Sequence, residues 1–308
     1  MLQQTQVTTV IPYFERFVLA FPSVNQLANA SEDQVLHKWT GLGYYARARN
    51  LHQTAKQIVT SHKGAFPLTV NELEMLPGIG KSTAGAIVAI CTNTRATILD
   101  GNVKRVLARC HAIEGWPGDS ATAKELWGIA DKLTPTKRVA DYTQAIMDLG
   151  ATLCTRSSPT CADCPFMKDC SAYRMGRIAD FPTKKPKKTL PVRKTTMFLI
   201  ENPQKELLLQ QRPSKGLWGG LWSFPEGEKT AAILDQLSMG AVRILSQQKL
   251  EEFRHTFTHF HLDITPIHVK LADTPPMIGE QASRWFAPDE PDEIGLTKPV
   301  TRLLKEIG

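Results

Sequence analysis

The chain has 308 residues, with 37 Lys and Arg against 30 Asp and Glu, so its formal net charge at pH 7 is +7. This length predicts two domains, at roughly 150 residues each, and the composition of 42% hydrophobic and 22% charged residues argues against disorder. No apolar run approaches the ~20 residues of a membrane helix, and no secretory signal follows Met1. The modest positive charge favours a polyanionic partner.

The first 170 residues have the patterns of helices. Ser31 with Gln34, and Thr69 with Glu72, have the capping-box spacing that satisfies free amides at a helix start. Apolar residues between positions 7 and 21 recur at three- and four-residue steps. Helices are therefore predicted over residues 7–21, 82–91, 102–112, 121–133 and 139–153. No alternating strand pattern interrupts them, which predicts an all-α domain.

The composition changes at residues 182–188, a basic stretch interrupted by proline, which we interpret as part of an interdomain linker. Beyond it, short β-type segments are predicted over 196–200, 206–210 and 257–269, and helices over 231–237 and 299–307. The predicted organisation is an all-α domain over residues 1–178, a linker over 179–194 and a small α+β domain over 195–308.

Four of the six cysteines fall in one short segment with the spacing C-x6-C-x2-C-x5-C: Cys154, Cys161, Cys164 and Cys170. Four thiolates on such a loop hold either a tetrahedral zinc ion or a cubane iron–sulfur cluster. Zinc modules usually use two close Cys pairs, whereas this segment has one pair and wider outer spacings, which better suit a larger cluster. We predict a structural metal centre and not a disulfide framework. Cys91 and Cys110 lie in apolar helical runs and are expected in the core.

Residues 76–80, Leu-Pro-Gly-Ile-Gly, join two predicted helices, and Lys81 begins the second. Gly78 and Gly80 allow a tight turn with its amides outward at the positive end of a helix, which suits a DNA phosphate. Lys81 adds charge without reading sequence. Taken alone, such a turn is more often only a turn. Asp100 stands at a later helix start, where aspartate is a favoured N-cap and needs no further role.

In combination, the hairpin, Asp100 and the cysteine loop resemble the helix-hairpin-helix, iron–sulfur DNA glycosylase superfamily. The match is close to the MutY-type adenine DNA glycosylases and covers essentially the whole chain. It is carried by residues 1–7, 39–51, 99–109 and 144–150. The resemblance implies an enzyme that removes adenine mispaired with 8-oxoguanine or guanine from double-stranded DNA. It also implies a 4Fe-4S cluster on the four cysteines, and we expect a monomer in the bacterial cytoplasm, acting at the nucleoid and not at a membrane.

The resemblance also implies roles for single residues. Glycosidic bond cleavage divides between an acid that protonates the leaving group and a carboxylate that faces the oxocarbenium ion. Asp100 would be that carboxylate, as electrostatic stabiliser or transient nucleophile, with Asn102 holding the sugar and water and Gln144 contacting the flipped adenine. Gln4 and Tyr44 would wedge into the base stack, although Tyr44 could equally be a core aromatic. The remaining substrate or DNA contacts implied in this domain are Gln3, Gly78, Gly80, Lys81, Ser82 and Lys104.

Position 82 discriminates within the superfamily. The endonuclease III-like relatives carry a lysine there, whose amine attacks the sugar and permits strand cleavage. Ser82 cannot form an imine, and Lys81 points elsewhere because adjacent helical residues lie about 100° apart. We therefore predict a monofunctional glycosylase.

The general acid of the family is a glutamate two residues before the methionine that corresponds to Met1. That glutamate and the helix before it lie outside this sequence, and Glu15 lies about three turns too far along to replace it. We interpret Met1 as a start codon placed too late. The alternative is a lesion-binding protein with impaired catalysis, because general acid catalysis is worth 10²–10⁴-fold.

Residues 207–213 and 216–226 resemble a Nudix fold. The carboxylate pairs with which Nudix hydrolases bind magnesium do not follow Gly227, so we predict binding and not nucleotide hydrolysis. Within residues 253–262, Phe257, Thr258 and His259 resemble the segment that recognises 8-oxoguanine, with threonine where relatives commonly have serine.

A zinc site is an alternative for the histidines of this segment. His255, His259 and His261 are separated by four and two residues, and strand residues at even separations share a face. No partner beyond Asp263 is evident. We therefore prefer DNA contacts and packing.

Overall fold

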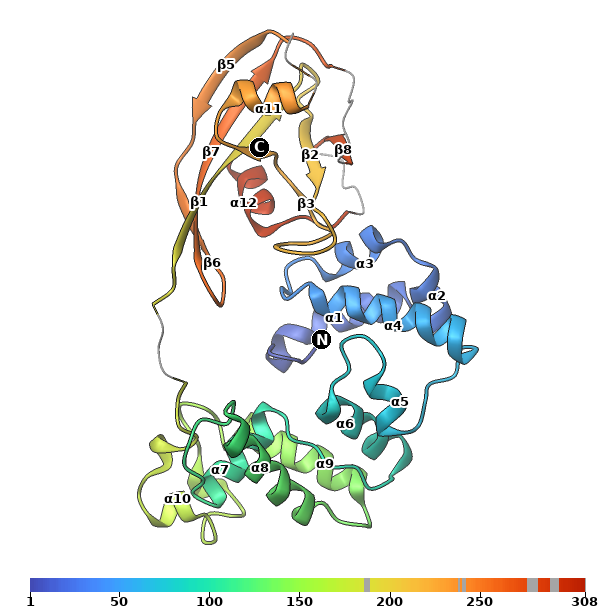
Figure 1. Ribbon diagram of the computed structural model, residues 1–308, viewed down its shortest axis with the longest axis vertical. Helices are drawn as coiled ribbons and strands as arrows, with labels where there is room; N and C mark the ends of the chain where they lie inside the picture. The colour runs from blue at the N-terminus through green and yellow to red at the C-terminus, as the bar shows by residue number, and fades with distance from the viewer. Residues whose placement is uncertain (186–188, 238, 240–241, 276–281, 289–293, 308) are drawn as a thin grey trace. The chain divides into compact units, whose positions relative to one another are not determined.

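The computed structural model describes residues 1–185, 189–237, 239, 242–275, 282–288 and 294–307 (Figure 1). The chain divides into two compact units. Unit 1 combines Met1–Gly64 with Thr189–Gly308, and unit 2 is Ala65–Lys188. The boundaries after residues 178 and 194 that the sequence suggests stay a prediction.

Unit 2 contains helices and, in its described residues, no strand. Its α-helices are α5 (Val70–Glu74), α6 (Lys81–Thr92), α7 (Gly101–Cys110), α8 (Ser120–Leu133), α9 (Val139–Asp148) and α10 (Ser171–Arg174). The all-α prediction for this part of the chain is confirmed. The helix predicted over 139–153 is α-helical to Asp148 and continues as a π-helix over Leu149–Leu153.

The core of unit 2 fixes the segment that joins α6 to α7. Ile98 and Leu99, which end this segment, are buried with Val103 and Leu107 of α7 and Leu126 of α8. Burying side chains of this size stabilises the fold by about 1.5–3 kcal/mol each. This apolar core is therefore one of the contacts that hold the start of α7.

Unit 1 begins with four helices: α1 (Val7–Ala20), α2 (Val24–Asn29), α3 (Glu32–Trp39) and α4 (Ala46–His62). The predicted capping box begins α3, because Ser31 Oγ accepts from Gln34 N at 3.2 Å and Ser31 N donates to Gln34 Oε1 at 3.0 Å. On α1, only Val10 and Phe17 of the predicted apolar stripe are buried. None of the described helices is long and apolar enough to cross a membrane.

The rest of unit 1 is a mixed sheet with two helices, α11 (Thr230–Gln236) and α12 (Lys298–Ile307). The strands are β1 (Val192–Glu201), β2 (Leu207–Gln211), β3 (Trp222–Ser223), β4 (Glu226–Gly227), β5 (Ile244–Lys249), β6 (Phe253–Thr256), β7 (His261–Leu271) and β8 (Ser283–Phe286). Their order is β3-β2-β1-β7-β5, with β4 on β1, β6 on β7 and β8 on β2. The pair β1 and β7 is parallel, from Val192 opposite His261 to Glu201 opposite Lys270. The predicted α+β fold is confirmed.

Two strand predictions need correction. The strand predicted over 257–269 begins only at His261, because residues 257–260 form a tight turn in which Phe257 N donates to Phe260 O at 2.9 Å. The predicted segments do not include β3, β4, β5, β6 and β8. Every residue of β5 is exposed, so it lacks the alternation of buried and exposed side chains on which such a prediction depends.

Two of the N-terminal helices of unit 1, α3 and α4, are joined by polar contacts to the part of the chain that forms the sheet. Asp33 of α3 accepts hydrogen bonds from Trp222 Nε1 at 3.0 Å and from Gln211 Nε2 at 3.4 Å. Arg49 of α4 donates to Gly219 O at 2.6 Å. These contacts join parts of the chain that are at least 170 residues apart, and explain why one compact unit contains both.

Candidate active site and cysteine cavity

The hairpin before α6 has the geometry of an anion-binding turn. Gly78 has a φ of +75°, a left-handed conformation that glycine adopts without strain. Gly80 precedes α6 and supplies no side-chain cap to the amides of its first turn. Lys81, the first residue of the helix, lies with Nζ 4.6 Å from the centroid of the Trp127 ring. The turn therefore presents backbone amides and one cation on the same end of α6.

Asp100 lies at the N-cap of α7, half-buried. Its Oδ1 accepts from Val103 N at 2.8 Å. Among the described residues, its Oδ2 has no hydrogen-bond partner. Capping fixes the side chain through one oxygen and leaves the other for a ligand.

Ser82 connects the hairpin helix to this aspartate. Its Oγ accepts a hydrogen bond from Leu99 N at 3.0 Å, one residue before Asp100. The structure thus brings the predicted residues Lys81, Ser82 and Asp100 into one region of unit 2. The side chain at position 82 is a hydroxyl and not an amine.

Asn102 is held by an arginine that the sequence analysis missed. Arg105 Nη2 donates to Asn102 Oδ1 at 2.8 Å, and Arg105 Nε donates to Cys154 O at 2.7 Å. Burial is the main cause that lowers the pKa of Arg105, and the charge of Arg109 adds to it, whereas Cys154 and Asp100 act in the opposite direction. One guanidinium therefore connects the start of α7 to the cysteine loop. The four-residue spacing of Arg105 and Arg109, which places both on one face of α7, is the signal that could have identified them.

Glycine at position 150 allows this approach. A Cβ atom there would lie 2.7 Å from Asn102 Cβ, so the π-helical turn packs directly on the start of α7. Gln144 lies one to two turns earlier on α9, exposed, and donates to Asp148 Oδ1 at 2.8 Å. Lys104 donates to Pro117 O at 3.3 Å, in the loop between α7 and α8.

The predicted residues Gln3, Gln4 and Tyr44 lie in unit 1, where Gln3 and Tyr44 contact Arg47. Its guanidinium donates to the carbonyls of Met1, Gln3 and Gly43 and lies 5.4 Å from the centroid of the Tyr44 ring. Tyr44 is 49% exposed and is not a core aromatic.

Two of the residues predicted to contact the base stack have unusual backbone conformations. Gln4 and Tyr44 have φ angles of +62° and +50°. Exposed non-glycine residues in this region are strained, which is typical of functional positions.

The predicted lesion-recognition residues lie on the turn between β6 and β7. Phe257 packs between Trp218, at 5.0 Å between ring centroids, and Phe260, at 4.7 Å. Thr258 and His259 are exposed at the tip, with Thr258 Oγ1 3.4 Å from His259 Nδ1. The turn therefore exposes a hydroxyl and an imidazole, and packed aromatic side chains support it.

The histidines of the zinc alternative have separate partners. His255 packs on Trp218 and Phe257, and His261 Nδ1 lies 2.9 Å from Thr256 Oγ1. In the described part of the chain, no three His, Cys, Asp or Glu side chains lie close enough to hold one metal ion.

The four loop cysteines line a single cavity of unit 2 together with Cys110. Arg109, 3% exposed, donates to Cys154 Sγ at 3.2 Å and to Thr155 O at 2.7 Å. Four thiols spread around one cavity, with a buried cation beside one of them, fit the corners of a polynuclear cluster better than a single ion.

The remaining two cysteines differ from expectation. Cys91 is exposed, so its prediction as a core residue is wrong. It lies on the last turn of α6, whose buried face is formed by Ala84, Gly85, Val88 and Ala89. Cys110 is half-buried at the cysteine cavity and not in the apolar core. Burial and the neighbouring Cys170 raise the pKa of the Cys110 thiol to about 12.

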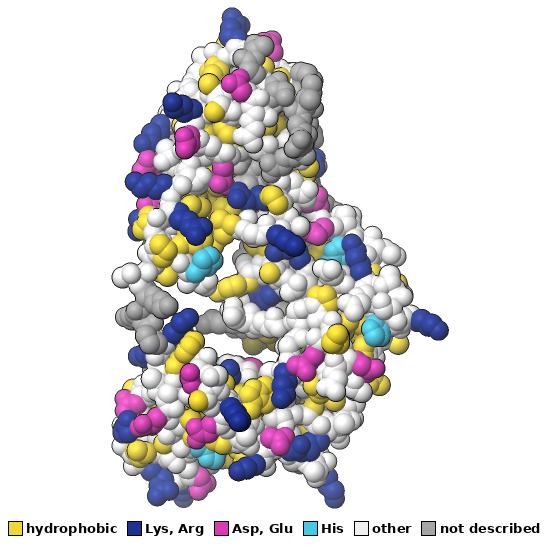
Figure 2. All heavy atoms as spheres, in the orientation of Figure 1, with side chains coloured by type: hydrophobic (Ala, Val, Ile, Leu, Met, Phe, Trp, Pro, Cys, Tyr) yellow, Lys and Arg dark blue, Asp and Glu magenta, His cyan; other side chains and the backbone are white. Residues whose placement is uncertain are grey.

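Basic side chains are spread out on the one face of the molecule that Figure 2 draws. On the face drawn in Figure 2, Lys and Arg side chains are scattered over both units. A chain with a net charge of +7 distributed in this way attracts a polyanion over a broad surface.

Comparison with known proteins identifies two domain families. Residues 1–132 match the HhH-GPD superfamily of base excision DNA repair proteins, and residues 196–306 match the NUDIX domain. Among solved structures, a trapped endonuclease III–DNA covalent intermediate is similar, with a TM-score of 0.50 and 22% identity. That match covers 57% of this chain and 81% of that chain. At this identity, the likeness establishes the fold alone.

Curated relatives match over the full chain. The adenine DNA glycosylase of Buchnera aphidicola subsp. Acyrthosiphon pisum (strain APS) is 37% identical over 99% of this chain and 87% of its own length. The adenine DNA glycosylase of Mus musculus is 33% identical over 94% of this chain and 66% of its own length. The chain therefore belongs to the adenine DNA glycosylase family of base excision DNA repair enzymes.

Proposed function

We propose that this DNA N-glycosylase hydrolyses the bond between adenine and deoxyribose where adenine is paired with 8-oxoguanine or guanine, without cleaving the strand. The observation that carries the proposal is the link from the hairpin helix to Asp100. Ser82 Oγ accepts a hydrogen bond from Leu99 N, and the next residue is Asp100, a half-buried carboxylate with one oxygen available. Family membership supports the reaction, and this geometry supports Asp100 as the residue that serves it.

The mechanism follows from the charge that the reaction develops. As the bond from C1′ to the adenine nitrogen breaks, its electrons leave with the base and C1′ becomes positive. Asp100 Oδ2 stabilises that charge, or bonds to C1′ transiently, until a water oxygen bonds to C1′ in its place. In the overall balance, the proton that this water loses is the one that the departing adenine gains, so the products are neutral adenine and a hydroxyl on C1′. Asn102, held by Arg105, orients the sugar and the water. Gln144 donates to and accepts from the edge of the extruded adenine.

DNA binding uses elements of both units. The turn at Gly78 and Gly80 with Lys81 binds backbone phosphate, and Gln3, Gln4 and Tyr44 contact the opened base stack. The turn with Phe257, Thr258 and His259 recognises the 8-oxoguanine, because an exposed hydroxyl can bond to the lesion. The enzyme acts as a monomer, in the cytoplasm, on nucleoid DNA.

The four loop cysteines fit a 4Fe-4S cluster, which would supply structural cross-linking of the loop. Cys154, Cys161, Cys164 and Cys170 would hold it as thiolates, and the buried Arg109 offsets their negative charge. Arg105 connects the backbone of that loop to Asn102, because it donates hydrogen bonds to both. A bound cluster would thus supply structural support to the loop that Arg105 connects to the start of α7.

The test is single-turnover release of adenine from duplexes with adenine opposite 8-oxoguanine or guanine. Asp100→Asn is expected to abolish release, while duplex affinity is retained. Asp119→Asn is the matched control, because Asp119 is the N-cap of α8 and asparagine caps as well as aspartate. Equal activity in Asp100→Asn and wild type would contradict the proposal. A wild-type chain that binds the duplexes but releases no adenine would instead support a lesion-binding protein.

A further inference from the structure

The segment that carries Asp100 has no regular structure of its own. Residues 93–99 lie between α6 and α7 and form neither helix nor strand. They end at the aspartate on which the proposed chemistry depends. What fixes this segment also fixes the carboxylate.

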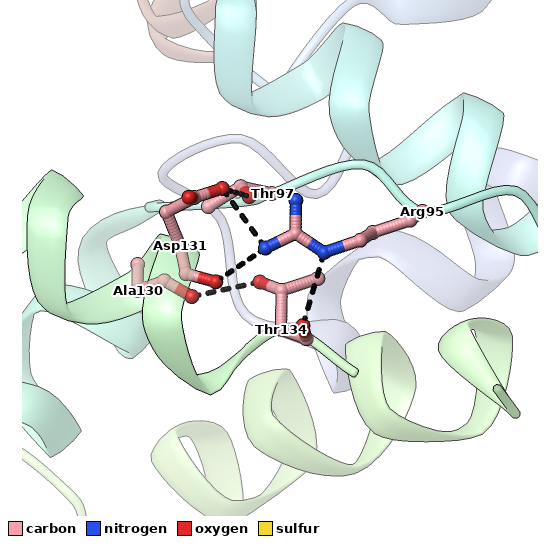
Figure 3. Close-up of polar contacts among 5 residues, drawn as sticks. All are labelled: Arg95, Thr97, Ala130, Asp131 and Thr134. Carbon is pink, nitrogen blue, oxygen red and sulfur yellow. Dashed lines mark hydrogen bonds and ion pairs between the residues drawn. The ribbon is translucent and has the colours of Figure 1, made fainter. Parts of the chain in front are cut away.

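Arg95 anchors the segment to the last turn of α8 (Figure 3). Its Nη2 donates to Asp131 O at 2.6 Å and its Nε to Thr134 O at 3.2 Å. The last carbonyls of a helix have no partner within the helix and carry its negative dipole end, so a guanidinium suits them. Arg95 thus caps α8 from a different part of the chain.

Thr97 makes the second anchor. Its Oγ1 donates to Asp131 Oδ1 at 2.7 Å, and Arg95 Nη2 lies 3.2 Å from the same oxygen (Figure 3). The Thr97 hydroxyl and the Arg95 charge lower the pKa of Asp131, so this carboxylate is ionised at neutral pH. We call Arg95, Thr97 and Asp131 the α8 clasp.

The opposite side of the segment lies against α6. A Cβ atom on Gly85 would lie 2.4 Å from Thr97 O, so the two backbones are in direct contact. Ser82 Oγ accepts from Leu99 N at 3.0 Å. The segment therefore packs between α6 and α8, and Thr97 contacts both helices.

We propose that the α8 clasp is a positioning device, which holds the Asp100 carboxylate where it faces the sugar of the extruded nucleotide. This inference rests on the proposed role of Asp100. Thr97 is three residues before Asp100. A displacement of the Thr97 backbone is therefore expected to displace the Asp100 carboxylate as well. A misplacement of about 1 Å in a catalytic group can lower a rate about 100-fold. The ion pair itself is exposed, with side chains 39% and 59% accessible, and such pairs add little to stability.

The experiment measures where the negative charge lies, independently of the general acid. One duplex carries a pyrrolidine in place of the adenine nucleotide, opposite 8-oxoguanine, and is cationic where the sugar becomes positive. The second carries a neutral tetrahydrofuran at the same position. The ratio of the two dissociation constants reports the electrostatic effect of Asp100 on the sugar site.

Wild type is expected to prefer the cationic duplex. Thr97→Val and Asp131→Asn are expected to lower that preference about tenfold, with little change in affinity for the neutral duplex. Thr97→Ser, which keeps the hydroxyl, restores it. Asp180→Asn removes an exposed Arg–Asp pair of similar accessibility that does not touch the segment, and keeps the wild-type ratio.

The outcomes separate the two proposals. If Asp100→Asn retains the preference, the proposed role of Asp100 is wrong. If Asp100→Asn loses it while Thr97→Val and Asp131→Asn keep it, the clasp does not position the carboxylate. Equal loss of affinity for both duplexes in the clasp variants would also overturn the inference, because it would indicate a general defect in binding or folding.

Discussion

The hydroxyl of Ser82 accepts a hydrogen bond from the backbone N–H of Leu99 at 3.0 Å, across 17 residues of chain. This bond joins the first turn of the hairpin helix to the residue before Asp100. In the proposed function, this one side chain therefore connects the helix that binds the phosphate backbone to the carboxylate that acts on the sugar. We therefore expect the identity of residue 82 to decide between hydrolysis alone and Schiff-base chemistry.

Replacing Ser82 by lysine is expected to make the protein capable of Schiff-base chemistry. The new amine would begin from the position of a hydroxyl that lies one residue from Asp100, close to C1′ of the bound sugar. Incubation with an abasic duplex and borohydride, followed by denaturing electrophoresis, would then show a covalent protein–DNA adduct. Wild type is expected to show none. Ser82→Ala controls for loss of the hydroxyl, and an adduct of equal yield in wild type would contradict a monofunctional site.

Replacing Arg109 by glutamine is expected to destabilise unit 2 by about 3–5 kcal/mol, because buried acceptors lose their charged donor. Arg109 is 3% exposed and donates to Cys154 Sγ and to the carbonyls of Thr155, Arg156 and Phe181. The measurements are urea unfolding and iron content per chain, both of which should fall. Arg174→Gln, an exposed arginine on α10, serves as control. Equal stability of the two variants would show that the buried contacts are dispensable.

Much of this molecule follows from local patterns in the sequence. The cap at Ser31 and the N-cap at Asp100 depend on residues three positions apart. Contacts between distant positions have no such signature. Arg95 and Asp131 are 36 residues apart, and an arginine in a loop is ordinarily only a solvated charge. The turn after Phe257 was predicted as strand, because its aromatic and histidine residues alternate, and the backbone bond to Phe260 that reverses the chain is not visible in that alternation.

Two glycines in helices of unit 2 are expected to respond oppositely to substitution by alanine. Gly128 of α8 has open space around a new Cβ, so Gly128→Ala should stabilise by about 0.5–1 kcal/mol through the lower entropy of the unfolded chain. In Gly85→Ala the Cβ would meet Thr97 O at 2.4 Å, and overpacking of this kind destabilises by about 1–3 kcal/mol. Thermal unfolding of both variants against wild type measures the difference. Stabilisation by Gly85→Ala would show that the contact between α6 and residues 93–99 is looser than described.

Stability is expected to fall as the pH is lowered from 7 to 5, because two histidines of unit 1 resist protonation when folded. Burial lowers the pKa of His52, whose Nε2 lies 3.0 Å from Ala30 O, and burial with nearby Lys298 lowers the pKa of His255. In the unfolded chain both titrate near pH 6.5. Below that pH, and above the folded pKa values, the unfolded chain binds more protons, so the free energy of unfolding decreases as the pH falls.

Replacing both histidines by glutamine removes these titrations and should flatten the pH dependence. Glutamine at position 52 keeps a donor for Ala30 O. Urea unfolding at pH 5, 6 and 7 gives the free energy of unfolding of both proteins. The gap between the two values is expected to shift in favour of the double variant as the pH falls. A gap that is constant from pH 5 to 7 would mean that neither imidazole couples protonation to folding.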